Sequence, residues 1–285
     1  MTATYEFVRS AGLLPGVFST TGYAAAGAIQ GVHRGLPSPS LTFIFSLDDP
    51  IVTAVSPEQL PTGRAGRNLI ITGGLHTAPA YVSQPPAQSG IQLAVHPLAA
   101  RALFGVPATE LGFPVTDGED VLGAAAEHVR TRLAETPDWD GRFAVLQAYL
   151  RRRVDRAGCR AAVRPELGEA WNWLARHRGN GSIDGLARHV LLSPRQLRTL
   201  FTREIGVGPK TVNRLLRFQQ VIRAIGRPVA SGEPVDLARI AADCGYFDQS
   251  HLTRAFRQFT GTSPTGWLAE ERRNLQAGGH RNGQD

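Results

Sequence analysis

Over the first 115 residues, short apolar runs alternate with clusters of glycine and proline. The runs are rich in β-branched and aromatic residues, and pairs such as Gly73-Gly74 and Pro85-Pro86 separate them. Short strands bounded by turn residues are typical of an antiparallel barrel or sandwich. We therefore expect a strand-rich domain with strands at residues 41–47, 51–55, 68–72, 80–83 and 91–95.

From about residue 118 the apolar period changes to that of a helix. One stripe precedes Pro137 and a second follows it, so the pattern predicts a helical hairpin over residues 118–157. The stripes either cover the strand-rich domain or form a dimer seam, and the pattern leaves both open. They consist of Val121, Ala125, Val129 and Leu133, then Phe143, Leu146, Leu150 and Val154.

Residues 165–275 have helical spacing throughout, beginning with a helix that Pro165 starts. Ser182 has the position of an N-cap for a short helix through His189. Ser193 and Gln196 then have the spacing of a capping box that opens another helix. Two short helices joined by a tight turn predict a helix-turn-helix unit.

The same arrangement returns 55 residues later, because YFDQSHLTRAFRQFTGTSP repeats LSPRQLRTLFTREIGVGP. In the second copy Gly245 is the expected turn and Asp248 the expected cap. Between the copies, the apolar positions from Val212 to Ile225 predict a linker helix of about 15 residues, so about 22 Å long. Such a spacer suits two recognition helices about 34 Å apart, one turn of DNA.

Each copy leaves a polar face opposite its apolar one. On the first recognition helix the outward set is Arg195, Arg198 and Thr199, and on the second it is Gln249, Ser250, Thr253 and Arg254. Such side chains donate to base edges and phosphates, or are ordinary solvated surface. On the linker helix, Lys210, Arg214 and Arg217 either touch phosphates or make internal ion pairs.

Charge is distributed unevenly along the chain. Residues 1–145 hold 8 Arg against 12 Asp and Glu, whereas residues 146–285 hold 23 Arg and Lys against 12 acids, an excess of 11 positive charges. A basic half joined to a slightly acidic one suggests a polyanion-binding module attached to another domain. No apolar run approaches a membrane span, no signal peptide is evident, and only Cys159 and Cys244 occur, so we expect a cytoplasmic protein with reduced thiols.

The chain resembles the AraC family of bacterial transcription regulators. IAADCGYFDQSHLTRAFRQFTGTSP is similar to the second helix-turn-helix signature of the family, and LSPRQLRTLFTREIGVGPKTVNRLLRFQ to the first. The resemblance implies that each recognition helix enters one of two successive major grooves, with Arg195, Arg198, Thr199, Gln249, Ser250 and Arg254 at base-facing positions. FIFSLDDP and LAVHPLAARALFGVPATELG resemble a regulatory domain of some members.

One position departs from the family pattern. Leu191 stands in the first turn, where the family often has glycine or a small residue. A positive φ at this position disfavours a bulky side chain.

Two other classes of protein compete with a regulator. His33, His76 and His96 suggest a metal-binding barrel, an enzyme or a sensor, but no close-spaced histidine pair supports it. The chain has no Gly-rich phosphate loop and no nucleophile elbow, so we expect neither an enzyme nor a cofactor. A sequence-blind architectural protein explains the charge but not two separately capped recognition helices.

The sequence therefore predicts an α+β protein of two domains. Residues 1–160 form a barrel- or sandwich-like regulatory or dimerisation domain, with strands over 1–115 and the hairpin over 118–157; residues 165–275 form the all-α DNA-binding domain; and residues 276–285 form a flexible tail. The expected partners are double-stranded DNA, a small-molecule effector, a second copy of the chain and, for an activator, RNA polymerase. No membrane partner is expected.

Overall fold

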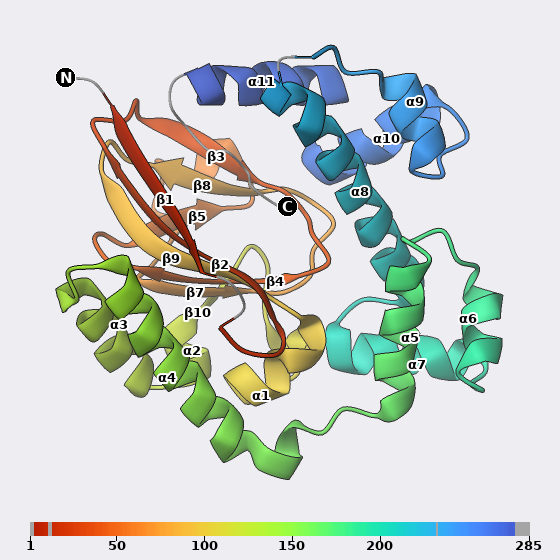
Figure 1. Ribbon diagram of the computed structural model, residues 1–285, viewed down its shortest axis with the longest axis horizontal. Helices are drawn as coiled ribbons and strands as arrows, with labels where there is room; N and C mark the ends of the chain where they lie inside the picture. Colours follow the sequence, from red (N-terminus) through yellow and green to blue (C-terminus); the bar gives the residue numbers. More distant parts are fainter. Residues whose placement is uncertain (1–2, 11–12, 232, 277–285) are drawn as a thin grey trace.

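The computed structural model describes residues 3–10, 13–231 and 233–276. The strands lie in the first part of the chain and the last seven helices form a block beside them (Figure 1). The predicted fold class, α+β with a strand-rich N-terminal region and an all-α C-terminal one, is confirmed. The predicted tail at 276–285 lies, apart from Gln276, outside the described residues.

Two antiparallel sheets make up the strand-rich region as far as the structure describes it. The six-stranded sheet has the order β1 (Thr4–Ser10), β2 (Val17–Ala26), β9 (Gln88–Val95), β4 (Leu41–Ser46), β7 (Ile70–Gly73) and β10 (Thr116–Asp117). The four-stranded sheet has the order β3 (Gly31–Gly35), β8 (Ala80–Gln84), β5 (Ile51–Ala54) and β6 (Gly66–Asn68). This arrangement matches the barrel- or sandwich-like prediction.

The strand pattern was readable only where strands are strongly apolar. The run at 68–72 divides at Leu69 into β6 and β7, which belong to different sheets, and β1, β2 and β3 were not predicted. β2 has the sequence VFSTTGYAAA, which contains three alanines, two threonines, a serine and a glycine, so it lacks the apolar run by which the other strands were predicted. A Cβ on Gly22 would lie within about 2.4 Å of the Trp139 ring, so glycine permits that close contact.

Three helices follow the last strand: α2 (Gly118–Leu122), α3 (Ala125–Glu135) and α4 (Trp139–Ala157). The predicted hairpin is formed by α3 and α4, whereas Val121 lies on the separate α2, which ends at Gly123. Phe143, Leu146 and Leu150 are buried in one core with the six-stranded sheet. The stripe therefore covers the sheet, and its interpretation as a dimer seam is wrong, because the sheet already occupies that face.

Short helical segments complete the strand-rich region. They are η1 (Pro57–Gln59), η2 (Pro97–Ala99), α1 (Ala100–Phe104), η3 (Ala108–Glu110) and η4 (Gly158–Ala161). Of these, η2, α1 and η3 lie against the C-terminal helices (Figure 1).

The C-terminal region consists of α5 (Pro165–Arg176), α6 (Ile183–His189), α7 (Pro194–Ile205), α8 (Pro209–Ser231), α9 (Leu237–Asp243), α10 (Gln249–Thr260) and α11 (Pro264–Gln276). The linker helix α8 has 23 residues rather than the predicted 15, so it is about 34 Å long. The prediction was too short because it followed only the apolar positions from Val212 to Ile225, whereas the helix begins at Pro209 and continues through Pro228 to Ser231. No helix of the described residues is both long and apolar enough to cross a bilayer.

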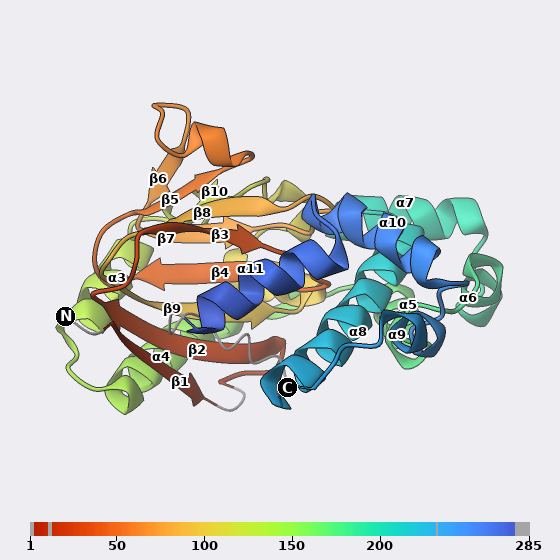
Figure 2. The same cartoon turned by 90° about the horizontal axis from the view of Figure 1, so that it is seen from above.

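The two regions are joined by arginines from the strand-rich region. Arg101 of α1 makes two hydrogen bonds to the carboxylate of Glu204 on α7, at 2.8 and 3.1 Å. Arg34 of β3 donates to the backbone carbonyl of Thr260, the last residue of α10, and to Glu270 of α11 at 3.3 Å. Both arginines thus hold the C-terminal ends of helices, where positive charge is favourable; Figure 2 shows α11 lying over β3.

An aromatic contact also joins the two regions. The His96 ring packs 4.8 Å from the Trp171 ring of α5 and 5.2 Å from that of Phe18, centroid to centroid. Burial lowers the pKa of His96 to about 4, so the ring is neutral at physiological pH. This histidine is therefore a packing residue between the regions.

We predict that the Arg101–Glu204 contact stabilises the attachment between the regions. In Arg101→Met and Glu204→Gln, each single change should lower the free energy of unfolding, and the double variant should lose less than their sum, with a coupling of about 1 kcal/mol. Denaturant unfolding of the intact chain, followed by tryptophan fluorescence, measures the cycle. Strictly additive losses would mean that the contact contributes nothing.

Candidate nucleic-acid interface

The first helix-turn-helix unit consists of α6 and α7. Ser182 caps α6 by accepting a hydrogen bond from the Gly185 N–H at 3.0 Å. The predicted capping box opens α7, since Ser193 Oγ accepts from the Gln196 N–H and Gln196 Oε1 accepts from the Ser193 N–H, at 3.2 and 2.9 Å. Leu197, Leu200 and Phe201 of α7 are buried against α5 and α6. Sequence and structure therefore agree on this unit.

The second unit repeats the arrangement with α9 and α10. Asp236 caps α9, and Asp248 caps α10 by accepting from the His251 N–H at 2.6 Å. Leu252, Phe256 and Phe259 of α10 are buried in a core that includes Leu215 to Ile225 of α8. The predicted supporting helix and cap are thus both present.

The predicted contact residues lie in the first two turns of each recognition helix. On α7, Arg195, Arg198 and Thr199 are exposed, and on α10 so are Gln249, Ser250 and Arg254, with Thr253 half-buried. Thr199 Oγ1 donates to the Arg195 carbonyl at 3.1 Å, a bond within the helix. Within the described residues, these side chains other than Thr199 form no hydrogen bond or ion pair, so their donors are free to bind a ligand.

The turn of the first unit contains a strained leucine. Leu191 has φ +55° and is 91% exposed, whereas the equivalent turn of the second unit has Gly245 at φ +74°. A left-handed conformation costs a residue with a Cβ about 1–2 kcal/mol. The turn nevertheless closes, because the Leu192 N–H donates to the Ala187 carbonyl at 3.0 Å.

The two units contact each other through the loop that follows α5. A Cβ on Gly245 of the second unit would lie within about 2.2 Å of the Asn180 side chain of the first, so the turns touch directly. Arg217 of α8 donates to the Gly179 carbonyl at 2.8 Å, and its guanidinium stacks 5.5 Å from the Tyr246 ring centroid. The cations of the linker helix were predicted either to touch phosphates or to make internal ion pairs. Arg217 therefore has an internal role, but its partners are a carbonyl and an aromatic ring rather than a carboxylate.

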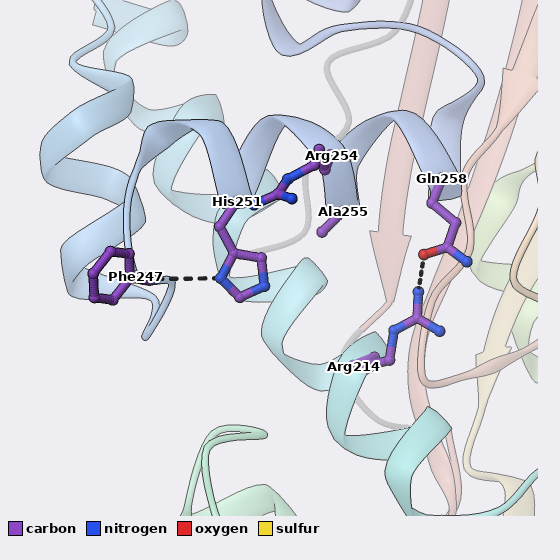
Figure 3. A pocket seen from close by; sticks show the side chains of 6 residues that line it. All are labelled: Arg214, Phe247, His251, Arg254, Ala255 and Gln258. Atoms are coloured by element: carbon purple, nitrogen blue, oxygen red, sulfur yellow. Dashed lines mark hydrogen bonds between the residues drawn. The ribbon is translucent and has the colours of Figure 1, made fainter.

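A groove of about 430 Å³ lies between α10 and α8 (Figure 3). The sequence did not predict it, because its walls come from two helices that are distant in the chain. Phe247, 93% exposed, stands at one end, and Arg254 is the one predicted contact residue in its lining. The spacing of 251, 254, 255 and 258 along one stripe of α10 is the signal that was available. The lining is Arg214, Phe247, His251, Arg254, Ala255 and Gln258.

The histidines considered as metal ligands are not brought together. His33 lies in β3, the Nδ1–H of His76 donates to the Ala78 carbonyl, and His96 accepts from the Leu98 N–H at 3.0 Å. Among the described residues, no group of three His, Cys, Asp or Glu side chains has a geometry that could hold a metal ion. Cys159 is exposed and Cys244 buried, both as free thiols.

Comparison with known proteins places the likeness in the C-terminal helices. A helix-turn-helix domain family matches residues 186–270. The arabinose operon regulatory proteins of Escherichia coli and Salmonella typhimurium are 28% and 26% identical over 103 residues, about 35% of this chain and 34–35% of each relative. The match therefore spans about a third of these curated relatives.

Two of the solved structures to which the chain is similar have TM-scores below 0.5. ToxT from Vibrio cholerae has a TM-score of 0.47 at 12% identity, covering 88% of this chain and 96% of ToxT. The C-terminal domain of AraT from Geobacillus stearothermophilus has a TM-score of 0.33 at 20% identity, covering 38% of this chain and 87% of that domain. These TM-scores are too low to support an argument from structure. The similarity to known proteins is therefore carried by the helix-turn-helix sequence match over residues 186–270.

We predict that relief of the left-handed strain at Leu191 stabilises the first unit. Leu191→Gly should raise the free energy of unfolding by about 1 kcal/mol, the strain removed less the entropy that glycine costs. Leu191→Ala keeps the Cβ and serves as the control, with little change expected. Calorimetric midpoints of the three proteins measure the effect, and a glycine variant no more stable than the alanine one would refute the strain.

Proposed function

We propose that this chain, whose C-terminal region is a helix-turn-helix domain of the AraC family, is a transcription regulator that reads two successive major grooves. The family assignment made from the sequence is confirmed by the match over residues 186–270 and by the arabinose operon regulators. The matched relatives are named as regulatory proteins, which agrees with a non-enzymatic role.

One observation carries the proposal. The two recognition helices α7 and α10 are separately capped, each has a polar N-terminal half, and the single linker helix α8 connects their two units. The N-terminal residues of a recognition helix are those that reach base edges in the major groove. Arginine donates in bidentate fashion to guanine, and glutamine pairs with adenine in the same way. Arg195, Arg198, Thr199, Gln249, Ser250, Thr253 and Arg254 are the proposed contact residues.

The strand-rich region is proposed to modulate DNA binding. Its arginines hold the C-terminal ends of both recognition helices, so a ligand or a second protomer that shifts this region would shift the helices as well. Since the stripe on α4 is buried, any dimer contact lies on another surface. A small-molecule effector, a homodimer and, for an activator, RNA polymerase remain the proposed partners besides DNA, in the cytoplasm.

The direct experiment is to bind the purified protein to fragmented genomic DNA and sequence what is retained. A regulator recovers a few sites that share one motif in two parts, one part for each helix. Recovery of sequences without any shared motif would favour a sequence-blind architectural protein instead.

We predict that single arginines on each recognition helix determine base preference. Arg198→Ala and Arg254→Ala should each weaken binding to the recovered operator by about 1–3 kcal/mol and relax the preference at one base pair. Fluorescence anisotropy with base-substituted operators measures both effects.

Arg239→Ala is the matched control, because Arg239 is equally a surface arginine but lies on the supporting helix α9, in an i,i+4 pair with Asp243. Its affinity and base preference should stay near those of the parent protein. If Arg198→Ala and Arg254→Ala behave like this control, α7 and α10 do not read the DNA.

We predict that the fragment beginning at Ala161 folds and binds one site of roughly 20 base pairs as a monomer. Its two cores are formed almost entirely by its own helices, with Leu36, Leu75 and Leu98 the partly buried contributions from outside. Circular dichroism, footprinting and ultracentrifugation of the fragment and the intact chain test this. A folded fragment that protects no DNA would place DNA binding elsewhere.

A further inference from the structure

We propose that the groove between α10 and α8 binds a backbone phosphate of the DNA, with Arg214 as the principal ligand. This inference rests on the proposed function and adds to it a phosphate site beside the second recognition helix. Base-facing residues set which sequence is bound, whereas a phosphate contact sets where each helix sits along the duplex.

The polar groups of the groove are donors. Arg214 and Arg254 carry guanidinium groups, and Gln258 Oε1 is already occupied because it accepts from Arg214 at 2.5 Å. His251 Nδ1 accepts from the Phe247 N–H at 3.4 Å, so Nε2 carries the hydrogen in the neutral ring. The lining holds no carboxylate. A concave surface of this kind attracts an anion.

Arg214 is held in place before any ligand binds. Its guanidinium lies 4.9 Å from the ring centroid of Phe259, which is fully buried, and one of its nitrogens donates to Gln258. Figure 3 shows Arg214 pointing from α8 toward Gln258 of α10, with Arg254 and His251 farther along α10 toward Phe247. A preorganised guanidinium loses less conformational entropy when it binds a phosphate. Arg214 therefore differs from a mobile surface arginine.

The position of the groove indicates a duplex phosphate. On a helical wheel, the groove stripe on α10 lies roughly 120° from the centre of the proposed base-facing set, and Arg254 stands between them. A helix in the major groove contacts bases with one face and the backbone with its flanks. The flank of α10 that faces α8 is therefore placed to meet the DNA backbone beside the bases that α10 reads.

The test is the salt dependence of binding by the full chain. With Arg214→Gln, the slope of log affinity against log salt should become less steep by about one, equally on the operator and on a random duplex. Arg223→Gln is the matched control, because Arg223 is an exposed arginine on the same helix, about 180° from Arg214. Its slope should equal that of the parent protein.

A second variant guards against a change in folding. Gln258→Glu leaves the stacking of Arg214 on Phe259 intact and places a carboxylate in the groove, so it should reduce the slope at least as much as Arg214→Gln. Circular dichroism confirms that each variant keeps its helices. In addition, a scan of neutral methylphosphonate linkages should find one backbone position that weakens the parent protein but not Arg214→Gln.

Each contrary result has a separate meaning. An unchanged salt slope in both variants overturns the phosphate site while leaving operator recognition intact. The site is also overturned if Arg214→Gln loses only its preference at one base pair, because Arg214 would then contact a base. If inorganic phosphate competes more strongly than chloride at equal ionic strength while the DNA slope of Arg214→Gln is unchanged, the groove binds a free anion instead. A parent protein that does not distinguish operator from random duplex contradicts the proposed function itself.

Discussion

The burial of one face of α8 in two small cores is the constraint on which the DNA-reading geometry depends. Val212 near its start belongs to the core of the first unit, whereas Leu215, Phe218, Val221 and Ile225 belong to that of the second. Because one continuous helix contributes to both, neither unit can rotate without exposing apolar surface. Arg217 and the contact of Gly245 with Asn180 add short-range links between the units.

The strand-rich region acts on the same two helices from the other side. Arg101 and Arg34 bind at the C-terminal ends of α7 and α10, and the donors proposed to meet DNA stand at the N-terminal ends. Holding a helix at its C-terminal end leaves the reading end open to solvent. The geometry thus couples the position of the N-terminal region to both recognition helices without covering them.

The candidate site was largely predictable because its signals are local. A cap, a capping box and a polar stripe each involve residues within one or two helical turns, so Ser193, Gln196 and Asp248 could be assigned before any packing was known. The groove was not predictable in this way. Arg214 and Gln258 are 44 residues apart, and only the packing of α8 on α10 brings them together.

The sequence by itself determined the two helix-turn-helix units, their proposed contact residues and the strand-rich class of the first region, because periodicity and capping act over short distances. Tertiary structure alone decided the strands β1 to β3, the assignment of the α4 stripe to the core and the length of α8. It also decided which arginine of α8 is internal and which lines a groove, since that choice depends on a neighbouring element rather than on spacing. Partners distant in the chain leave no local pattern, so only the folded molecule reveals them.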